Sequence, residues 1–209
     1  MAAVHYQVKA EVVDLRSDTP RPEDAFFVDT NVWYWLTYPR CRIVHKKPKN
    51  YQIRDYPDYI KRARKAQARL FTCGLCFSEL ANLIEKDELD IFRQAKGGKI
   101  EPKEFRHNEE SERAKVVSQI QDSWAMVKSF ASFLGILLDE ALADKACQDL
   151  NSLPVGPQDL FMAESSLKAG ASQIITDDGD FAAIPGIRVF TANRNVIRAA
   201  QDQSKYIIR

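Results

Sequence analysis

The stretch AFFVDTNVWYWL, residues 25–36, decides the predicted fold. It begins with a continuous apolar run that ends at Asp29, a pattern typical of a parallel-sheet strand buried on both faces. Thr30 and Asn31 follow, and both residue types suit the cap of a helix that carries the apolar residues VWYWL. We therefore expect a buried strand over residues 25–29, an acid at its end and a helix directly after it.

Outward from this stretch, strand patterns alternate with helix patterns along the chain. Such alternation is typical of an α/β fold with a mainly parallel sheet. We therefore expect a three-layer α/β/α sandwich with a short, mainly parallel central sheet. Further strands are expected at residues 71–77, 136–138, 172–176 and 187–190. Helices are expected at residues 57–70, 78–94, 109–134, 139–150, 157–168 and 192–203, and loops at residues 38–50 and 95–108.

The first residues show a different period, because Val4, Tyr6 and Val8 are separated by polar side chains. This period of two predicts a half-buried strand, and a polar link with two prolines follows it. We expect an N-terminal arm over residues 1–24 that adds an edge strand to the sheet. The rest of the chain is expected to form one domain over residues 25–203, with a helical insertion around residues 95–134 and a tail at residues 204–209.

The composition indicates a soluble globular protein, since 45% of its 209 residues are hydrophobic and 28% are charged. The longest apolar run, FLGILL, is too short to cross a bilayer, and no secretory signal is visible at the start. Four cysteines without dense spacing indicate free thiols in a reducing compartment. We therefore expect cytoplasmic localisation and no membrane partner.

The net charge of +1 conceals two blocks of opposite sign. Residues 40–70, the basic window, hold eleven Lys and Arg against two Asp, while residues 137–184 hold nine acids against two Lys. A polyanion-binding protein with a carboxylate-rich centre would show such blocks, and solvated helix faces are the alternative explanation.

Acids recur where predicted strands give way to helices or turns, at Asp29, Glu79, Asp159, Asp177, Asp178 and Asp180. In a parallel sheet the ligand site lies beyond the carboxyl ends of the strands, at a topological switch point. Carboxylates gathered there would repel one another unless a cation neutralised them. Oxygen ligands without Cys or His suit Mg²⁺ or Mn²⁺ better than zinc.

Each of these acids has a simpler explanation when it is taken alone. Asp29 could serve simply as the cap of the helix after it. Glu79 and Asp159 could serve simply to complement helix dipoles. The acids at residues 177–180 could only form a turn. Their recurrence at junctions that one parallel sheet gathers together favours a shared site.

Two of the four cysteines form the motif Cys73-x-x-Cys76. A metal clasp would require a second pair of ligands, and a thioredoxin-like redox pair would stand at the start of a helix. Here the pair falls within the strand predicted at residues 71–77. We therefore expect both residues to be buried thiols with a packing role.

Four fragments in this order, FFVDTNVW, SELANL, QDLFMAESSLKAGASQIITDDGDF and PGIRVF, resemble the PIN-domain nucleases, especially the bacterial VapC-like toxins. In that family a strand ends in Asp-Thr-Asn, here residues 29–31, and a Ser-Glu helix start supplies a second acid, here Glu79. A third acid opens a helix, here Asp159, and a Thr-x-Asp-x-Asp-Phe turn supplies the fourth, here within residues 176–181. The resemblance spans residues 25 to about 193 with gaps, and the arm and residues 95–117 exceed the compact toxins of the family.

The resemblance implies hydrolysis of a nucleic-acid phosphodiester, most often in RNA, with a divalent metal. The catalytic residues it implies are Asp29, Glu79, Asp159 and Asp178. The expected ligands of Mg²⁺, or of Mn²⁺ in its place, are Asp29, Asp159 and Asp178. Hydrogen bonds and charges that support these ligands would come from Asn31, Thr176, Asp177 and Asp180. Alignment on Thr176 favours Asp178 among the three neighbouring acids as the ligand.

Beside such a site, the basic window would attract the phosphates of a nucleic acid. The residues expected to bind it are Arg40, Arg42, Lys46, Lys47, Lys49, Arg62 and Lys65. Tyr51, Tyr56 and Tyr59 lie among them and either stack on unpaired bases or pack within the fold.

Together these features predict a metal-dependent endoribonuclease that acts on RNA, as the toxin of a toxin–antitoxin pair. The family resemblance implies an antitoxin partner and a homodimer. Two alternatives remain open, namely a nuclease for DNA or structured nucleic acid and a catalytically silent PIN module that binds RNA or protein. Acids at all four motifs count against the silent module, because a retired site has no reason to keep so costly a charge cluster.

Overall fold

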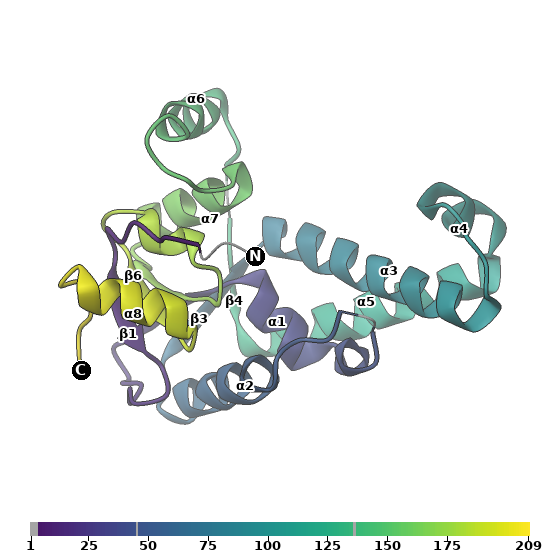
Figure 1. The fold of residues 1–209 in the computed structure, drawn as a ribbon, viewed down its shortest axis with the longest axis horizontal. Coiled ribbons are helices and arrows are strands. Elements are labelled where there is room, and N and C mark those ends of the chain that lie inside the picture. The colour runs from purple at the N-terminus through teal and green to yellow at the C-terminus, as the bar shows by residue number, and fades with distance from the viewer. Residues whose placement is uncertain (1–3, 45, 136) are drawn as a thin grey trace.

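Six parallel strands form one sheet in the part of the chain that the computed structural model describes, residues 4–44, 46–135 and 137–209 (Figure 1). Their order across the sheet is β1-β6-β5-β2-β3-β4. The strands are β1 (Glu11–Asp14), β2 (Ala25–Val28), β3 (Arg69–Cys73), β4 (Ser132–Leu134), β5 (Gln173–Ile175) and β6 (Arg188–Thr191). The expected mainly parallel sheet is confirmed.

The central strand is β2, which pairs with β5 on one side and β3 on the other. Phe26, Phe27 and Val28 are fully buried, as the continuous apolar run predicts. From β2 the chain proceeds outward to β3 and β4, then returns to β5 and proceeds outward on the other side to β6. The topological switch point therefore lies between β2 and β5.

Helices cover both faces of the sheet, because right-handed connections that run in opposite directions from the centre place their helices on opposite sides. Figure 1 shows α1 and α2 on one side of the strands and α7 on the other. The first group comprises α1 (Thr30–Thr37), α2 (Asn50–Lys65), α3 (Gly74–Lys96), α4 (Pro102–Asn108) and α5 (Glu110–Phe130). The connection from β4 to β5 holds α6 (Glu140–Asp149) and α7 (Pro157–Lys168), and α8 (Arg194–Asp202) follows β6. The predicted α/β/α sandwich is confirmed.

The helices α3 and α5 project beyond the sheet as a long hairpin that carries α4 near its far end (Figure 1). With 23 residues, α3 is about 35 Å long. The hairpin has a small core of its own around Leu89, Phe105 and Val116. Among the described helices, none combines the length and the apolar character that crossing a membrane requires.

Several predicted element boundaries are wrong. The helix predicted at residues 57–70 begins at Asn50, with Pro57 inside it. Proline is common at the first position of a helix, which suggested a start there. The real start is capped differently, since the Gln52 side chain accepts a hydrogen bond from the backbone N–H of Lys49 at 2.7 Å. At the start of α1, the cap is Asp29 rather than Thr30 or Asn31.

The segments on either side of the hairpin also differ from the prediction. The strand predicted at residues 71–77 ends at Cys73, and α3 begins at Gly74 rather than at residue 78. The expected loop at residues 95–108 contains α4, and the helix expected to reach residue 134 ends at Phe130. The next strand is Ser132–Leu134, paired with β3, rather than residues 136–138. Of that predicted strand, residues 137 and 138 lie in no strand and residue 136 falls outside the described residues.

The N-terminal arm forms the expected edge strand, β1, which pairs with β6. Only Glu11–Asp14 belong to the strand, although the alternation in burial begins at Tyr6. The segment expected as a tail is fixed to this arm, because the backbone N–H of Ile207 donates to the carbonyl of Val12 at 2.9 Å. The tail therefore extends the contacts of the edge strand.

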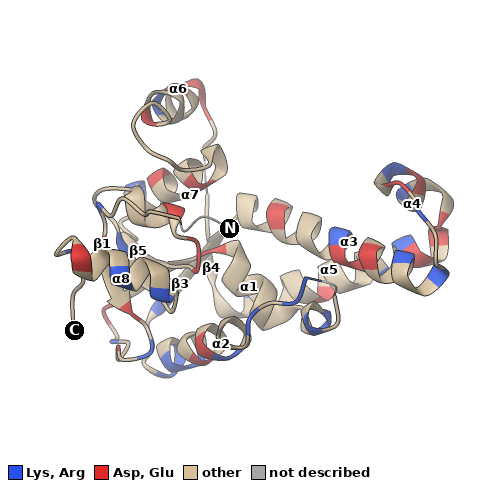
Figure 2. Cartoon of the chain, in the orientation of Figure 1, with Lys and Arg blue, Asp and Glu red and all other residues tan. Residues whose placement is uncertain are grey.

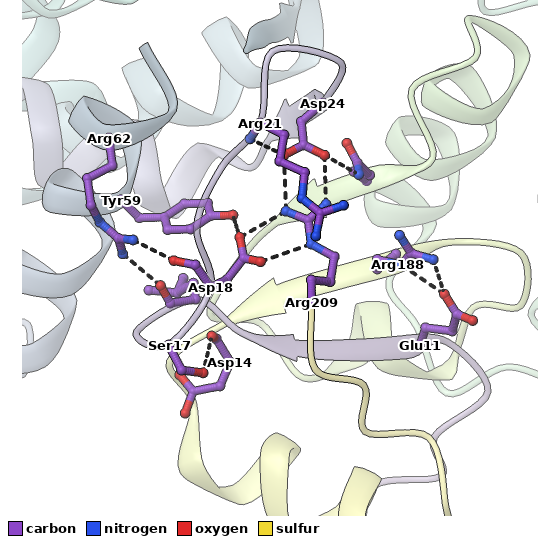
Figure 3. Close-up of polar contacts among 12 residues, drawn as sticks. Glu11, Asp14, Ser17, Asp18, Arg21, Asp24, Tyr59, Arg62, Arg188 and Arg209 are labelled. Atoms are coloured by element: carbon purple, nitrogen blue, oxygen red, sulfur yellow. Dashed lines mark hydrogen bonds and ion pairs between the residues drawn. The ribbon is translucent and has the colours of Figure 1, made fainter. Parts of the chain in front are cut away.

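Arg209 joins the tail to the link between β1 and β2 in a buried cluster, the arginine clamp, formed with Asp18 and Asp24 (Figure 3). Its guanidinium donates to Asp18 Oδ1 at 2.9 Å and to Asp24 Oδ1 at 2.7 Å. It also lies over the ring of Phe190, 4.6 Å from the ring centroid. The Asp18 and Asp24 carboxylates are buried with a cation that binds both of them.

Candidate metal site at the carboxyl edge of the sheet

Three segments bring acids to the carboxyl ends of β2 and β5, where the topological switch point lies. Asp29 follows β2 directly, and residues 176–180, the acidic turn, follow β5. Asp159 stands in the first turn of α7, as predicted. Figure 2 shows acidic segments on α7 and on the loop beside it. This is the edge where parallel sheets bind their ligands.

Asp29 is held from three sides at the start of α1. Its Oδ1 accepts a hydrogen bond from the Thr30 backbone N–H at 2.6 Å. Its Oδ2 accepts from Asn31 Nδ2 at 2.5 Å and from Thr176 Oγ1 at 2.6 Å. The predicted roles of Asn31 and Thr176 as donors to this carboxylate agree with these contacts.

Burial raises the pKa of Asp29 well above its usual value. The hydrogen bond from Thr176 opposes this rise, and the negative charges of Glu79, Asp159 and Asp178 add to it. Asp29 therefore lies within electrostatic reach of all the other acids that the sequence singled out as catalytic.

The tightest group of acids consists of Asp159, Asp178 and Asp180, the carboxylate cluster. Each contributes a carboxylate oxygen, and these oxygens all lie within 4.8 Å of one another. Burial raises the pKa of Asp159 to about 7, and the charges of Asp178, Glu79 and Asp180 add to this shift. Mutual repulsion of this kind is relieved by a bound cation.

The conformation of the acidic turn positions Asp178 and Asp180. Thr176 Oγ1 accepts a hydrogen bond from the backbone N–H of Asp178 at 2.9 Å, while it donates to Asp29. The backbone N–H of Asp180 donates to Asp178 Oδ1 at 3.0 Å. One hydroxyl group thus links the acid that follows β2 to the turn that follows β5.

Asp177 points away from the cluster and towards α2. Its carboxylate accepts hydrogen bonds from Gln52 Nε2 at 2.6 Å, from the Tyr56 hydroxyl at 2.7 Å and from the Tyr51 hydroxyl at 3.1 Å. Of the three neighbouring acids, Asp178 and Asp180 therefore face Asp159, and Asp177 ties the turn to a helix. These orientations set Asp177 apart from the two acids that face Asp159.

Glu79 faces the cluster without belonging to it. It lies in the second turn of α3, because that helix begins earlier than predicted. Its Oε2 accepts a hydrogen bond from Gln158 Nε2 at 3.2 Å. Its charge contributes to the raised pKa of both Asp29 and Asp159, which places it beside them.

The grouping differs from the expected ligand set in one residue. The sequence predicts Asp29, Asp159 and Asp178 as ligands, and the structure brings together Asp159, Asp178 and Asp180. Asp29 is turned towards its three donors beside this group. All the potential metal-ligating atoms of the cluster are carboxylate oxygens. Such oxygens fit Mg²⁺ or Mn²⁺ and are poor ligands for soft metals.

The predicted nucleic-acid-binding residues are divided between two places. Lys46, Lys47 and Lys49 are exposed just before α2. Burial raises the pKa of Asp177, and the charge of Lys49 opposes this rise together with the hydrogen bonds to the carboxylate. Arg62 lies about 18 Å further along this helix, where it donates to the carbonyls of Leu15 and Asp18.

The remaining members of this set lie elsewhere in the fold. Arg40 forms an ion pair with Glu88 at 2.7 Å, Arg42 is exposed after α1, and Lys65 is the last residue of α2. Tyr56 and Tyr59 are fully buried, so of the two expectations for the tyrosines the packing role holds for them. Tyr51 is half-buried and bonded to Asp177.

Tyr6 and Gly179 contribute to this edge and were not singled out in the sequence. The ring of Tyr6 packs so closely on Gly179 that a Cβ placed there would come within 2.1 Å of Tyr6 Cε1. Gln203 Nε2 fixes the arm by donating to the Tyr6 carbonyl at 2.9 Å. The only local signal was the glycine between two acids, which by itself indicates a turn.

Gly156, just before α7, was also missed. A Cβ at this position would lie 2.9 Å from Asp159 Oδ2. The absence of a side chain therefore leaves the room that the Asp159 carboxylate occupies.

The prediction that Cys73 and Cys76 both lie within a strand holds for Cys73, the last residue of β3, and is wrong for Cys76. Cys73 caps α3 and Cys76 lies in its first turn. The expectation that both thiols are buried and free is confirmed. No protein-family model matches this chain, and no curated protein matches it either.

Proposed function

We propose that this protein is a divalent-metal-dependent endonuclease with RNA as its substrate. The observation that carries the proposal is the carboxylate cluster, in which oxygens of Asp159, Asp178 and Asp180 lie within 4.8 Å of one another at the switch point. Asp29 and Glu79 stand beside it, and the four motifs in which these acids occur resemble those of PIN-domain nucleases. Fold and resemblance therefore point to the same edge of the sheet.

The cluster would hold Mg²⁺, or Mn²⁺, through carboxylate oxygens. Such an ion lowers the pKa of a bound water and offsets the charge that develops on the phosphate. Asn31 and Thr176 fix the orientation of the Asp29 carboxylate before any substrate arrives, which lowers the cost of reaching a reactive geometry. Glu79, which accepts a hydrogen bond from Gln158, would orient the attacking water from α3.

The exposed lysines before α2 would attract the substrate. Lys46, Lys47 and Lys49 lead into the helix whose first turn contacts the acidic turn through Gln52. Figure 2 shows this basic stretch as blue segments along the chain that enters α2. Phosphate attraction of this kind depends strongly on salt. The toxin role, with an antitoxin partner and a homodimer, rests on the family resemblance alone.

The test is cleavage of labelled single-stranded RNA and DNA with Mg²⁺, Mn²⁺ or EDTA. Wild type is compared with Asp178→Asn and with Asp144→Asn, a matched control at an exposed acid of α6. We expect RNA cleavage that requires metal, is lost in Asp178→Asn and persists in Asp144→Asn. Preferential cutting of DNA would replace RNA as the substrate. Metal-independent RNA binding by all three proteins without any cutting would contradict the nuclease and support a silent binding module.

A further inference from the structure

Cys73 and Cys76 form a dithiol at the start of the longest helix in the described chain. Cys73 has the extended backbone of a helix cap, with φ −146° and ψ 175°, and Cys76 lies in the first turn of α3. Their sulfur atoms are 3.6 Å apart. This arrangement, a Cys-x-x-Cys pair that opens a helix, is the one in which thiols become reactive.

The geometry lies close to that of a disulfide. A disulfide requires the sulfur atoms to approach to about 2.05 Å with Cβ atoms roughly 3.5–4.5 Å apart. Residues three positions apart at a helix start are neighbours on one face, with Cβ atoms about 5–6 Å apart. Closing the bond therefore calls for a small rotation of two side chains and a slight tightening of one turn.

The two thiols have unequal acidities. The hydrogen bond with Cys76 lowers the pKa of Cys73 to about 7; burial opposes this shift, and the backbone N–H groups of Cys76 and Leu75 reinforce it. The same hydrogen bond and burial raise the pKa of Cys76 well above its usual value. These directions favour Cys73 over Cys76 as the nucleophile.

We propose that Cys73 and Cys76 are a redox modification site at which a hydroperoxide converts the dithiol to an intramolecular disulfide. The Cys73 thiolate attacks one oxygen of hydrogen peroxide, the O–O bond breaks, and hydroxide leaves and is protonated to water. The Cys76 sulfur then attacks the sulfur of the Cys73 sulfenic acid, its thiol proton is released, and a second water leaves. Two thiols lose two electrons in total, and the peroxide is reduced to two waters.

The chain beside the two cysteines reaches the protein surface on one side. Gly74, the residue after Cys73, is exposed. The nearest side-chain atom to a Cβ placed there is Cζ of Phe133, at 3.7 Å. Phe133 belongs to the edge strand β4 and is 58% exposed. The start of α3 therefore lies at the protein surface, one residue from Cys73, where an oxidant as small as hydrogen peroxide can approach.

The pair lies directly behind the candidate metal site. Cys76 Sγ is 4.0 Å from the carbonyl of Val28, the residue before Asp29, and 3.8 Å from Met162 Sδ in α7. Glu79 follows Cys76 by almost one helical turn. Tightening the first turn of α3 therefore changes the support of three catalytic acids, although disulfide formation itself does not depend on the nuclease function.

The experiment is hydrogen peroxide treatment of the folded protein, followed by alkylation of the remaining thiols and mass analysis of the intact chain and its peptides. Cys41 and Cys147 are internal controls, because Cys41 is buried with a pKa raised to about 11 by burial and Cys147 is exposed. We expect the loss of two hydrogen atoms, a peptide that links Cys73 to Cys76, and reversal by dithiothreitol. Alkylation of both Cys73 and Cys76 after a dose that oxidises Cys147 would overturn the proposal.

Two variants test the assigned order of events. Cys76→Ser is expected to trap a sulfenic acid at Cys73, visible as a dimedone adduct, because the second thiol is missing. Cys73→Ser is expected to give no adduct at Cys76 under the same conditions. An adduct at Cys76 but none at Cys73 would contradict the assigned nucleophile. Thermal melting of both variants shows whether they remain folded.

Discussion

Acids gather at two places around this sheet, and their surroundings are opposite. In the arginine clamp, Asp18 and Asp24 are each 3% exposed, and both bind Arg209. At the carboxyl edge, among the described residues, no Lys or Arg forms an ion pair with Asp29, Glu79 or the carboxylate cluster. The same residue type is paired with an arginine of the chain at one place and has no such partner among the described residues at the other.

The pKa shifts follow this difference. Burial alone would raise the pKa of Asp24, but hydrogen bonds from Arg209, from the Arg21 backbone and from Gln173 outweigh it and lower the pKa. Burial raises the pKa of Asp159 to about 7 with three neighbouring negative charges added. Mutual repulsion among acids that lack a cationic partner indicates a functional site better than burial of the acids does. Acids with a structural role, such as Asp18 and Asp24, are paired with a cation of the same protein.

The largest expected effect comes from breaking the clamp with Arg209→Ala. The side chains of Asp18 and Asp24 would remain buried without their cation, and removing one partner of a buried pair costs about 3–5 kcal/mol. Urea denaturation of the variant and wild type measures this loss. Adding Asp18→Asn and Asp24→Asn to Arg209→Ala should recover part of it. An Arg209→Ala protein as stable as wild type would show that the clamp contributes little.

The second-largest effect is expected from Asp178→Asn, which tests whether the acids at the carboxyl edge differ from those of the arginine clamp. Asp178→Asn should reduce cleavage by more than the roughly 10–100-fold loss that removing an outer partner of a metal ligand causes. In the absence of metal the same variant should melt at a higher temperature than wild type, because it removes repulsion from Asp159 and Asp180. Thermal scans in EDTA measure this gain. A lower melting temperature in EDTA would mean that the cluster is not a site of strain.

A smaller effect is expected at the contact between the arm and the acidic turn. Gly179→Ala would place a methyl group within 2.1 Å of the Tyr6 ring, so ring or turn must shift. Overpacking of this kind costs about 1–3 kcal/mol. Gly98→Ala is a matched control, because nothing lies within 4 Å of a Cβ there. In a double-mutant cycle by urea denaturation, Tyr6→Ala should remove most of the penalty, and an unchanged penalty would place its cause elsewhere.

The smallest effect is the dependence of stability on pH. The pKa of Asp159 is raised, so its contribution to stability is complete below its usual value of 3.8 and is lost as pH rises through about 7. The pKa of Asp24 is lowered, so its contribution is present above 3.8 and is lost as pH falls below that value. Because metal binding requires ionised carboxylates, the rise in melting temperature on adding Mg²⁺ should be larger at pH 8 than at pH 5.5. An equal rise at both pH values would argue against binding at the carboxylate cluster.

The fold was largely predictable because its signals are local. The apolar run at residues 25–28 becomes the central strand, and Pro157–Lys168 forms a helix with the predicted bounds. The predicted start of α2 was wrong because capping by the Gln52 side chain depends on a contact that propensity does not express. The predicted start of α3 was wrong because the chain passes from β3 into the helix directly at Cys73, without a side-chain cap that would mark the boundary. The strand near residue 133 was misplaced because an apolar run does not reveal its register, which pairing with β3 decides.

The strand–helix alternation and the positions and number of the acids at the junctions follow from the sequence alone, since periodicity and residue type are local features of the chain. Which of these acids meet depends on the tertiary structure. It turns Asp177 towards α2 and Asp180 towards Asp159, although the two residues are three positions apart. It also separates Lys49 from Arg62 by the length of α2 and brings Tyr6 onto Gly179. The physical reason is that orientation and proximity between distant segments follow from packing and hydrogen bonds, which no local pattern specifies.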